Sequence, residues 1–411
     1  MLDKSYLLPA EALNRVLSAV PERQGKTERL KIEECYGRIL ASSVAAPEDL
    51  PAFARSTVDG YAVRSSDTFG ARESLPAYLS ITGEVFMGAA PGFSVGKGEG
   101  AKIPTGGMLP SGADAVVMLE HAETVSGDTI EVMKPAAPHE NVIRSGEDVE
   151  KGMLVLTRGR LLRPQDIGAL AGLGITETDV FAKPVVALIS TGDEIVPPDR
   201  AVRPGQVRDI NSFTLAGLIR DHGGAPIKKG IFSDEYGAIR GAVEEALAEA
   251  DMVLISGGTS AGVKDMTSTI IDDSGKPGVL FHGVSLKPGK PMIGGVVGGT
   301  PVFGLPGHPA AAVVCFDLFI LPLLERLNGL DTGRCFPGTV RAQMAKSIAS
   351  SAGREDHIRV ALEWRDGALL ALPVLGKSGL ITTLVKADGT VVIPPGKPGL
   401  DAGEEVAVRL F

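Results

Sequence analysis

Apolar positions follow a regular order in the second half of the chain. An apolar run at 184–190 precedes a helical pattern at 213–224, and a run at 226–232 precedes a helical pattern at 234–250. Another apolar run follows at 251–256. Strands that alternate with helices in this way predict βαβ units, a parallel sheet and helices on both of its faces. We therefore expect a doubly wound α/β domain, completed by apolar runs near 279–286 and 300–305 and by an apolar helix that begins at Ala310.

The flanking regions carry shorter apolar runs that Gly-rich turns separate. Runs such as 77–85, 115–119 and 129–133 predict a small β-rich unit, and short strands return after Gly329. Helical patterns are present at 9–20 and 164–174. The predicted organisation is an N-terminal domain of 1–48 and 141–180, an inserted β-rich domain of 49–140, an α/β domain of 181–328 and a C-terminal β-barrel of 329–411.

Composition and charge exclude several classes of protein. The 411 residues include 41 Lys or Arg and 50 Asp or Glu, for a net charge of −9, so we expect no nucleic-acid partner. The most apolar segment is broken by Asp317 and Pro322, which is typical of a buried helix rather than a membrane span. Three cysteines without a C-x-x-C pair and the lack of an evident signal peptide indicate a reducing, cytoplasmic location.

Three polar segments come directly after predicted strands, at 190–194, 256–262 and 304–309. Ligands of an open α/β sheet bind beyond the carboxyl ends of its strands, so these segments predict one site. The glycine-rich segment 256–262 can cradle an oxyanion with its backbone N–H groups. A tight strand-to-helix turn explains it equally well, and the segment alone leaves both interpretations open.

Charged residues recur near the same edge. Glu194, Asp234 and Asp265 are each explained individually as surface acids or helix caps, but together beside a phosphate they favour a bridging divalent cation. Lys287 and Lys290 lie in the loop Lys-Pro-Gly-Lys-Pro. That loop suits an oxyanion, or is a surface turn.

Seven segments, in this order, resemble a known family. STGDE (190–194), SGGTSAGVKD (256–265), KPGKP (287–291) and GLPGHP (304–309) are similar to the molybdopterin-binding fold, which MogA/MoaB-type adenylyltransferases share with MoeA/gephyrin-E molybdenumtransferases. The N-terminal half favours the second group. PAFARSTVDGYA (51–62), IPTGG (103–107) and NVIRSGED (141–148) resemble its motifs, and a C-terminal β-domain fits it as well.

The resemblance implies a molybdopterin molybdenumtransferase, which inserts molybdate into adenylylated molybdopterin and releases AMP. It also implies Mg²⁺ dependence, an elongated homodimer built on the N-terminal domain, and an active site shared between subunits. Further implied partners are a MogA/MoaB-type adenylyltransferase and molybdoenzyme maturation factors. The alternatives are the adenylyltransferase itself and a non-catalytic molybdopterin carrier or scaffold.

The family's functional residues carry over to matching positions of this chain. The implied catalytic residues are Asp59, Thr105, Arg144, Glu194, Asp234 and Asp265, of which the last three are also the implied Mg²⁺ ligands. The implied molybdopterin-binding residues are Thr191, Gly192, Ser256, Gly257, Gly258, Ser260, Pro306 and Pro309. The implied molybdate-binding residues are Lys287, Lys290, Pro291, Ser378 and an arginine, either Arg354 or Arg359.

Three positions depart from the family pattern. Ala311 replaces a serine implicated in molybdate binding, His308 stands where an asparagine is common, and Gly283 stands where common bacterial members have a lysine. We therefore expect the lysines, Ser378 and the arginine to carry more of the anion binding. The sequence does not distinguish molybdate from tungstate.

Overall fold

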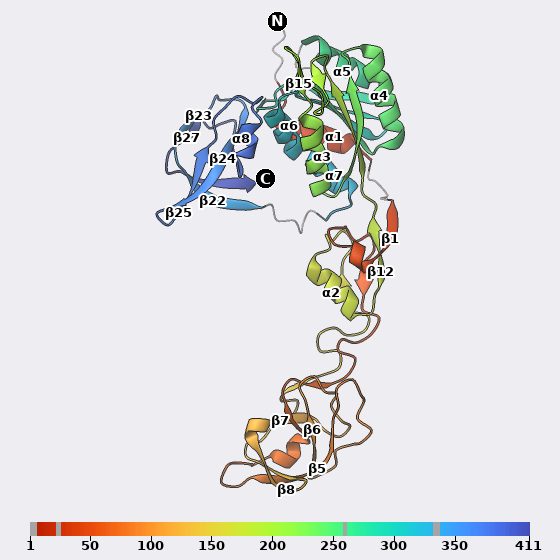
Figure 1. The fold of residues 1–411 in the computed structure, drawn as a ribbon, viewed down its shortest axis with the longest axis vertical. Helices are drawn as coiled ribbons and strands as arrows, with labels where there is room; N and C mark the ends of the chain where they lie inside the picture. Colours follow the sequence, from red (N-terminus) through yellow and green to blue (C-terminus); the bar gives the residue numbers. More distant parts are fainter. Residues whose placement is uncertain (1–5, 22–25, 258–260, 332–337) are drawn as a thin grey trace.

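The structure, a computed structural model, describes residues 6–21, 26–257, 261–331 and 338–411. The molecule is elongated, with the α/β domain and the C-terminal β-barrel side by side at one end and the inserted β-domain at the other (Figure 1). A narrow middle region connects the two ends.

The α/β domain is built on a six-stranded sheet. Its order is β16-β13-β17-β21-β20-β18, with bounds β16 (Ala225–Phe232), β13 (Val185–Thr191), β17 (Met252–Gly257), β21 (Thr300–Leu305), β20 (Ile293–Val297) and β18 (Pro277–His282). The first four strands are parallel, but β20 is antiparallel to both β21 and β18. The sheet is therefore mixed rather than parallel throughout, while the doubly wound α/β class is confirmed. A turn of two glycines at positive φ, Gly298 and Gly299, joins β20 to β21 and leaves no length for a crossover helix.

Helices cover both faces of this sheet, as the apolar pattern predicts. Val186 and Leu188 of β13 contribute to the apolar cluster on one face, and Ala187 and Ile189 contribute to the cluster on the other. The first cluster is completed by α1 (Pro9–Ala19), α3 (Asn211–Asp221), α6 (Pro309–Cys315) and α7 (Leu321–Leu327). The second cluster is completed by α4 (Tyr236–Glu249) and α5 (Ala261–Ser274).

The apolar segment that begins near Ala310 forms buried helix, as expected, but it is not one regular α-helix. A π-helical turn (Phe316–Ile320) separates α6 from α7. Among the helices of the described residues, none has the length and apolar character that crossing a membrane requires.

The C-terminal domain is a closed barrel that pairs with the α/β domain. Its strands run in the order β24-β25-β22-β28-β26, and β26 pairs again with β24. Strand β19 (Leu286–Lys287) of the α/β domain pairs with β24 and so places the barrel beside the carboxyl edge of the sheet. The remaining bounds are β22 (Thr339–Met344), β23 (Ile348–Ala349), β24 (Glu355–Arg365), β25 (Ala368–Pro373), α8 (Thr382–Val385), β26 (Gly389–Ile393), β27 (Gly399–Leu400) and β28 (Glu405–Leu410).

The inserted domain and the middle region consist mainly of short strands. The inserted sheet has the order β7-β4-β6-β5-β9-β8, and three two-stranded pairs, β1-β12, β2-β11 and β3-β10, lie outside it. The bounds are β1 (Thr27–Lys31), β2 (Val44–Ala45), β3 (Arg55–Ser56), β4 (Gly60–Val63), β5 (Ala77–Glu84), β6 (Glu99–Ile103), β7 (Ala115–Met118), β8 (Ala122–Ser126), β9 (Thr129–Val132), β10 (Val142–Ile143), β11 (Leu154–Leu156), α2 (Pro164–Gly172) and β12 (Glu177–Phe181). A further pair, β14 (Ile195–Val196) and β15 (Val207–Arg208), lies in the α/β domain.

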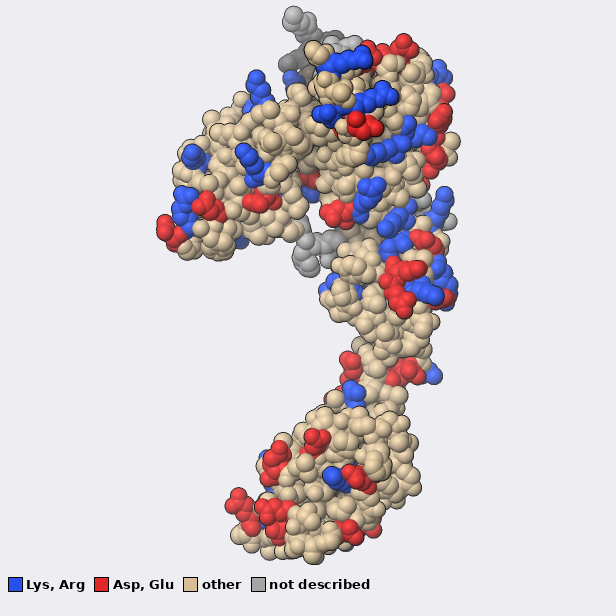
Figure 2. All heavy atoms as spheres, viewed as in Figure 1, with Lys and Arg blue, Asp and Glu red and all other residues tan. Residues whose placement is uncertain are grey.

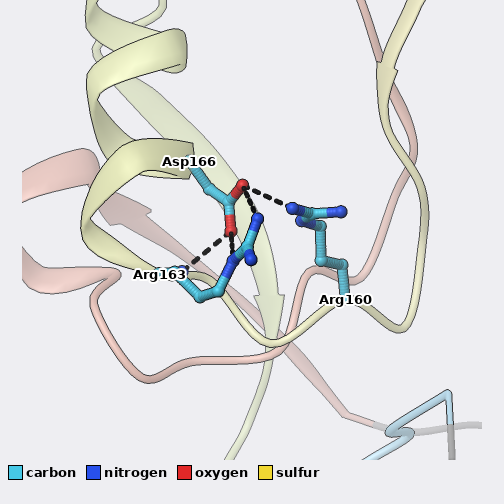
Figure 3. A network of polar contacts seen from close by, with 3 residues as sticks. All are labelled: Arg160, Arg163 and Asp166. Carbon is cyan, nitrogen blue, oxygen red and sulfur yellow. Dashed lines mark hydrogen bonds and ion pairs between the residues drawn. The ribbon is translucent and has the colours of Figure 1, made fainter. Parts of the chain in front are cut away.

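A buried carboxylate fixes the start of α2 in the middle region. Asp166 accepts hydrogen bonds from Arg160 Nη2 at 2.7 Å and from Arg163 Nε at 3.1 Å, and also from the Arg163 backbone N–H at 3.0 Å (Figure 3). Burial by itself would raise the pKa of Asp166, but these hydrogen bonds outweigh it and lower the pKa from 3.8 to about 2. The network therefore stabilises the folded state wherever the carboxylate is ionised.

Asp166→Asn should lower the free energy of unfolding by about 2 kcal/mol, because each pKa unit corresponds to about 1.4 kcal/mol. The loss should be constant from neutral pH down to the ordinary aspartate range. It should disappear only as acid protonates the wild-type carboxylate towards pH 2. Urea unfolding measures it. The control is Asp179→Asn, whose partner Arg29 is exposed, so the change should be about 0.5 kcal/mol or less. Equal losses in the two variants would contradict the role of the network.

Candidate functional site

A cavity of about 310 Å³ opens at the carboxyl edge of the α/β sheet. Ser190 at the end of β13, Ser256 and Gly257 at the end of β17, and Gly307 and Pro309 after β21 line it. The three polar segments that the sequence predicts at one edge therefore meet, as parallel strands require. We refer to this space as the edge cavity.

The ends of β13 and β17 approach each other so closely that only glycine fits between them. Gly257 has φ +150°, and a Cβ added there would lie 1.9 Å from the carbonyl oxygen of Thr191. Thr191 and Gly192 are buried behind this contact and do not line the edge cavity. The glycine thus serves the packing of the strand ends at a point where backbone borders a cavity.

Two residues that the sequence did not single out organise the edge cavity. Asn211 donates from Nδ2 to Ser256 Oγ at 2.8 Å and to the Gly307 carbonyl oxygen at 3.0 Å, so it connects two of the three loops. Asp209 accepts a hydrogen bond from Ser190 Oγ at 2.9 Å. The sequence feature that could have identified them is an Asp-x-Asn just before a helical pattern. On the sequence alone this resembles an ordinary helix start.

A second cavity, of about 860 Å³, lies between the α/β domain and the C-terminal barrel. We refer to it as the interdomain cavity. The residues that the resemblance assigns to molybdate all line it, namely Lys287, Lys290, Pro291, Arg354, Arg359 and Ser378. Pro306 of the molybdopterin set lines it as well. They converge because β19 pairs with β24, which joins the lysine loop to the arginine strand.

The cationic side chains of the interdomain cavity differ in whether a carboxylate of the chain already pairs with them. Arg354 donates to the buried carboxylate of Asp356 at 2.7 Å and 3.3 Å, and Lys287 Nζ lies 3.7 Å from the same carboxylate. Arg359 is also buried, but it donates only to the Gly376 carbonyl oxygen at 3.1 Å, and its Nε has no partner among the described residues. Burial lowers the pKa of Arg359. Arg359 is therefore the arginine whose charge is available to an anion.

The three departures from the family pattern all lie at this cavity or beside it. A Cβ at Gly283 would lie 2.4 Å from the ring of Tyr6, and Lys290 Nζ lies 4.6 Å from the centre of that ring. Ala311 is buried in the cavity wall. His308 lines both cavities, and its Nδ1 lies 2.8 Å from Ser378 Oγ.

A group of carboxylates lies beside the edge cavity. The Asp234 backbone N–H donates to Asp193 Oδ1 at 3.2 Å, and Glu194 lines the edge cavity. Burial, followed by the charges of Asp193 and Glu194, raises the pKa of Asp234. Helix α4 has Glu235 as its N-cap, so Asp234 does not cap it.

The carboxylates of Glu194 and Asp234 suit a hard cation. The third predicted ligand, Asp265, has a side chain outside the described part of the structure. Asp234 Oδ1 has no hydrogen-bond partner in the described part of the chain, and like-charged carboxylates held together favour a divalent ion between them. Asp265 belongs to α5, but its side chain lies outside what the structure describes, as do Gly258 and Ser260. Among the described residues, no group of three metal-ligating side chains is complete.

The remaining sequence-predicted residues lie in or beside the inserted domain. Asp59 Oδ1 accepts hydrogen bonds from the Thr105 backbone N–H at 2.7 Å and from Thr105 Oγ1 at 3.1 Å, and these lower the pKa of Asp59. Arg144 Nε lies 3.5 Å from Glu147 Oε2. The inserted domain is at the far end of the molecule from the α/β sheet, so one chain does not bring these residues to the two cavities (Figure 1).

Charge is distributed unevenly along this shape. Lys and Arg side chains gather over the visible face of the α/β domain, and acidic side chains are prominent on the inserted domain (Figure 2).

Three family models together match most of the chain. They are "MoeA N-terminal region (domain I and II)" over residues 8–174, "Probable molybdopterin binding domain" over 187–326, and "MoeA C-terminal region (domain IV)" over 341–411. The class is therefore a multidomain protein that carries a molybdopterin-binding α/β domain between MoeA-specific regions.

Relatives match over nearly their whole length. The molybdopterin molybdenumtransferases of Bacillus subtilis and Haemophilus influenzae are each 32% identical, covering 100% and 98% of this chain and 96% and 98% of theirs. A crystal structure of the molybdopterin biosynthesis MoeA protein of Pyrococcus horikoshii OT3 matches with a TM-score of 0.86 at 34% identity, covering 99% of this chain and 100% of the other. The chain belongs to the MoeA family of molybdopterin molybdenumtransferases.

Proposed function

We propose that the protein inserts molybdate into adenylylated molybdopterin and releases AMP. The observation that carries this proposal is the adjacency of the two cavities, which share His308 in their walls. The edge cavity offers hydroxyl and backbone groups at strand ends, which suit the phosphate and the pterin. The interdomain cavity offers lysines and a buried arginine without a carboxylate partner, which suit a tetrahedral dianion.

Glu194, Asp234 and Asp265 are the residues that would hold Mg²⁺ in this proposal. The raised pKa of Asp234 and its unpartnered Oδ1 support them. The cation would neutralise charge on the phosphoanhydride of the substrate. The residues of the edge cavity bind and orient the substrate, while Asp59 and Thr105 act from the inserted domain.

The interdomain cavity also bears on the alternatives. An adenylyltransferase handles no molybdate and has no need of the cation-rich wall that the C-terminal barrel supplies. A non-catalytic carrier would not need Asp59, Glu194 and Asp234 together. Both alternatives are therefore less well supported than the molybdenumtransferase.

Location and partners follow from the proposed chemistry. The buried thiols of Cys35 and Cys315 are free, which suits the reducing cytoplasm. A MogA/MoaB-type adenylyltransferase would make the substrate, and molybdoenzyme maturation factors would take the product.

The assay of this function measures two products at once. Purified protein with adenylylated molybdopterin, Mg²⁺ and molybdate should release AMP and form molybdenum-containing cofactor in equal amounts. AMP release without metal incorporation would contradict the proposed role of the interdomain cavity. If both activities persist after Mg²⁺ is removed by a chelator, the proposed metal site is wrong.

We further propose a homodimer in which the inserted domain of one chain faces the α/β domain of its partner. The inserted domain, which carries Asp59, lies at the opposite end of the chain from the α/β domain, which carries Glu194, and a symmetric dimer is the simplest arrangement that brings the two domains together.

Mixing two inactive variants tests the shared site. Asp59→Asn and Glu194→Gln should each be inactive alone, but a mixed dimer contains one composite site with neither substitution. Co-expressed chains that pair at random should therefore show about a quarter of the wild-type activity per chain. Two affinity tags, one on each variant, then isolate the mixed dimers. Light scattering should give twice the chain mass. Mixed dimers without activity, or a fully active monomer, would overturn the proposal.

A further inference from the structure

We propose that His308 is a positioning residue that couples protonation to molybdate binding by freeing the hydroxyl of Ser378 for the anion. This inference rests on the proposed function, because it takes the interdomain cavity as the molybdate site. It concerns a residue at which this chain departs from the family pattern, so the role belongs to this chain's own site.

His308 occupies the boundary between the two cavities and is held there from both sides. Its Nδ1 lies 2.8 Å from Ser378 Oγ, and its carbonyl oxygen accepts hydrogen bonds from the N–H groups of Ala311 and Ala312 at 3.0 Å. The Ser378 carbonyl oxygen accepts a hydrogen bond from the Ala310 N–H at 3.1 Å. Backbone contacts thus fix both partners of the side-chain hydrogen bond across the domain boundary.

The proton inventory of this pair determines what Ser378 offers to an anion. A serine hydroxyl has one proton to donate, whereas a histidine ring has one or two N–H groups. When Nδ1 carries no proton, the Ser378 hydroxyl donates its hydrogen bond to the ring. When the ring is doubly protonated, Nδ1–H donates to Ser378 Oγ, and the hydroxyl proton becomes free to donate into the interdomain cavity. The neutral ring with its proton on Nδ1 frees the hydroxyl too, but brings no charge.

The charged groups around His308 make this change depend on the anion. Lysines and arginines on the cavity walls outnumber carboxylates by six to three: Lys287, Lys290, Arg354, Arg359, Lys377 and Arg208 against Asp356, Glu194 and Asp209. His357 also lines the interdomain cavity, with Nε2 2.7 Å from Glu355 Oε1. Another positive charge on this wall is favourable when a dianion is present to meet it.

Two consequences follow from linkage. Because the anion favours the protonated ring, binding takes up protons, and affinity for molybdate rises as pH falls through the range in which histidines titrate. The gain reflects a hydrogen bond to a charged group and the added cation, so we expect about ten-fold tighter binding at about pH 6 than at about pH 8.

The test measures binding of molybdate alone to the full-length protein by calorimetry at both pH values. Micromolar molybdate keeps the anion monomeric, and two buffers of different ionisation enthalpy reveal proton uptake. The wild type should take up protons when it binds molybdate. His308→Asn should bind molybdate with little pH dependence and no uptake. Ser378→Ala should bind more weakly than the wild type at about pH 6, should approach the wild type at about pH 8, and should keep only the part of the pH response that the charge of the ring supplies.

Matched controls separate this role from general effects of a histidine. His282→Asn makes the same change at an exposed position that lines neither cavity, and it should behave as the wild type. His357→Gln removes the other titratable histidine of the cavity wall and should keep the pH response. If His308→Asn retains the response, or if His357→Gln abolishes it, the inference is wrong while the molybdate site stands. If the wild type does not bind molybdate, the proposed site and the inference both fail.

Discussion

Asp59→Asn should lower the rate of AMP release by about 10²-fold or more, the loss typical when a group that stabilises transition-state charge is removed. Asp59 accepts two hydrogen bonds from Thr105, and an asparagine oxygen can still accept from the Thr105 N–H. The inserted domain should therefore fold normally. Molybdate binding, which we place at the other end of the chain, should not change.

The control for this prediction is Asp128→Asn in the exposed turn between β8 and β9. It removes the same charge from the same domain and should keep the wild-type rate. Rates are measured with saturating adenylylated molybdopterin and Mg²⁺, and the fold is checked by the unfolding transition. Near-normal AMP release by Asp59→Asn would remove the inserted domain from the active site.

Arg359→Gln should raise the molybdate concentration for half-maximal insertion by roughly ten- to a hundred-fold. A hydrogen bond to a charged group contributes about 1.5–3 kcal/mol, and each 1.4 kcal/mol changes affinity ten-fold. Arg359 is buried, and no carboxylate pairs with it in the described chain, so its charge is fully available to the anion. AMP release without molybdate should change little.

The matched variant is the double substitution Arg354→Gln with Asp356→Asn. It removes the other arginine together with the carboxylate that Arg354 binds at 2.7 Å, so the net charge of the cavity is unchanged. This variant should need a molybdate concentration within a few-fold of the wild type. If its effect equals or exceeds that of Arg359→Gln, Arg354 is the arginine that meets the anion, and the distinction drawn from the ion pair is wrong.

Local pattern was sufficient for the elements that carry the edge cavity. The alternation of β13, α3, β16, α4 and β17 is confirmed, because strands with helices packed on both faces must be apolar at successive positions and their helices must be amphipathic. The convergence of three loops at one edge follows from parallel pairing alone. The same reasoning missed β20, whose two glycines weaken the apolar signal, and hence missed its antiparallel hairpin with β21.

The family and the domain types could also be recognised from the sequence, because motifs that bind phosphate and carboxylate-held cations keep their residues in a fixed local order. The matches over residues 8–174, 187–326 and 341–411 confirm that recognition. The assignments of individual residues stay predictions.

Only the tertiary structure decided which charges are available. Lys287, Arg354 and Arg359 are equivalent cations in the sequence, but the pairing of β19 with β24 places Asp356 against the first two and leaves Arg359 without a carboxylate. The contact of His308 with Ser378 likewise joins residues 70 positions apart. Periodicity and motifs reflect the burial pattern and the chemistry of each segment alone, and they therefore determine the elements and the family. Neutralisation of a charge depends on which segment packs against it, and that is settled only when the domains meet.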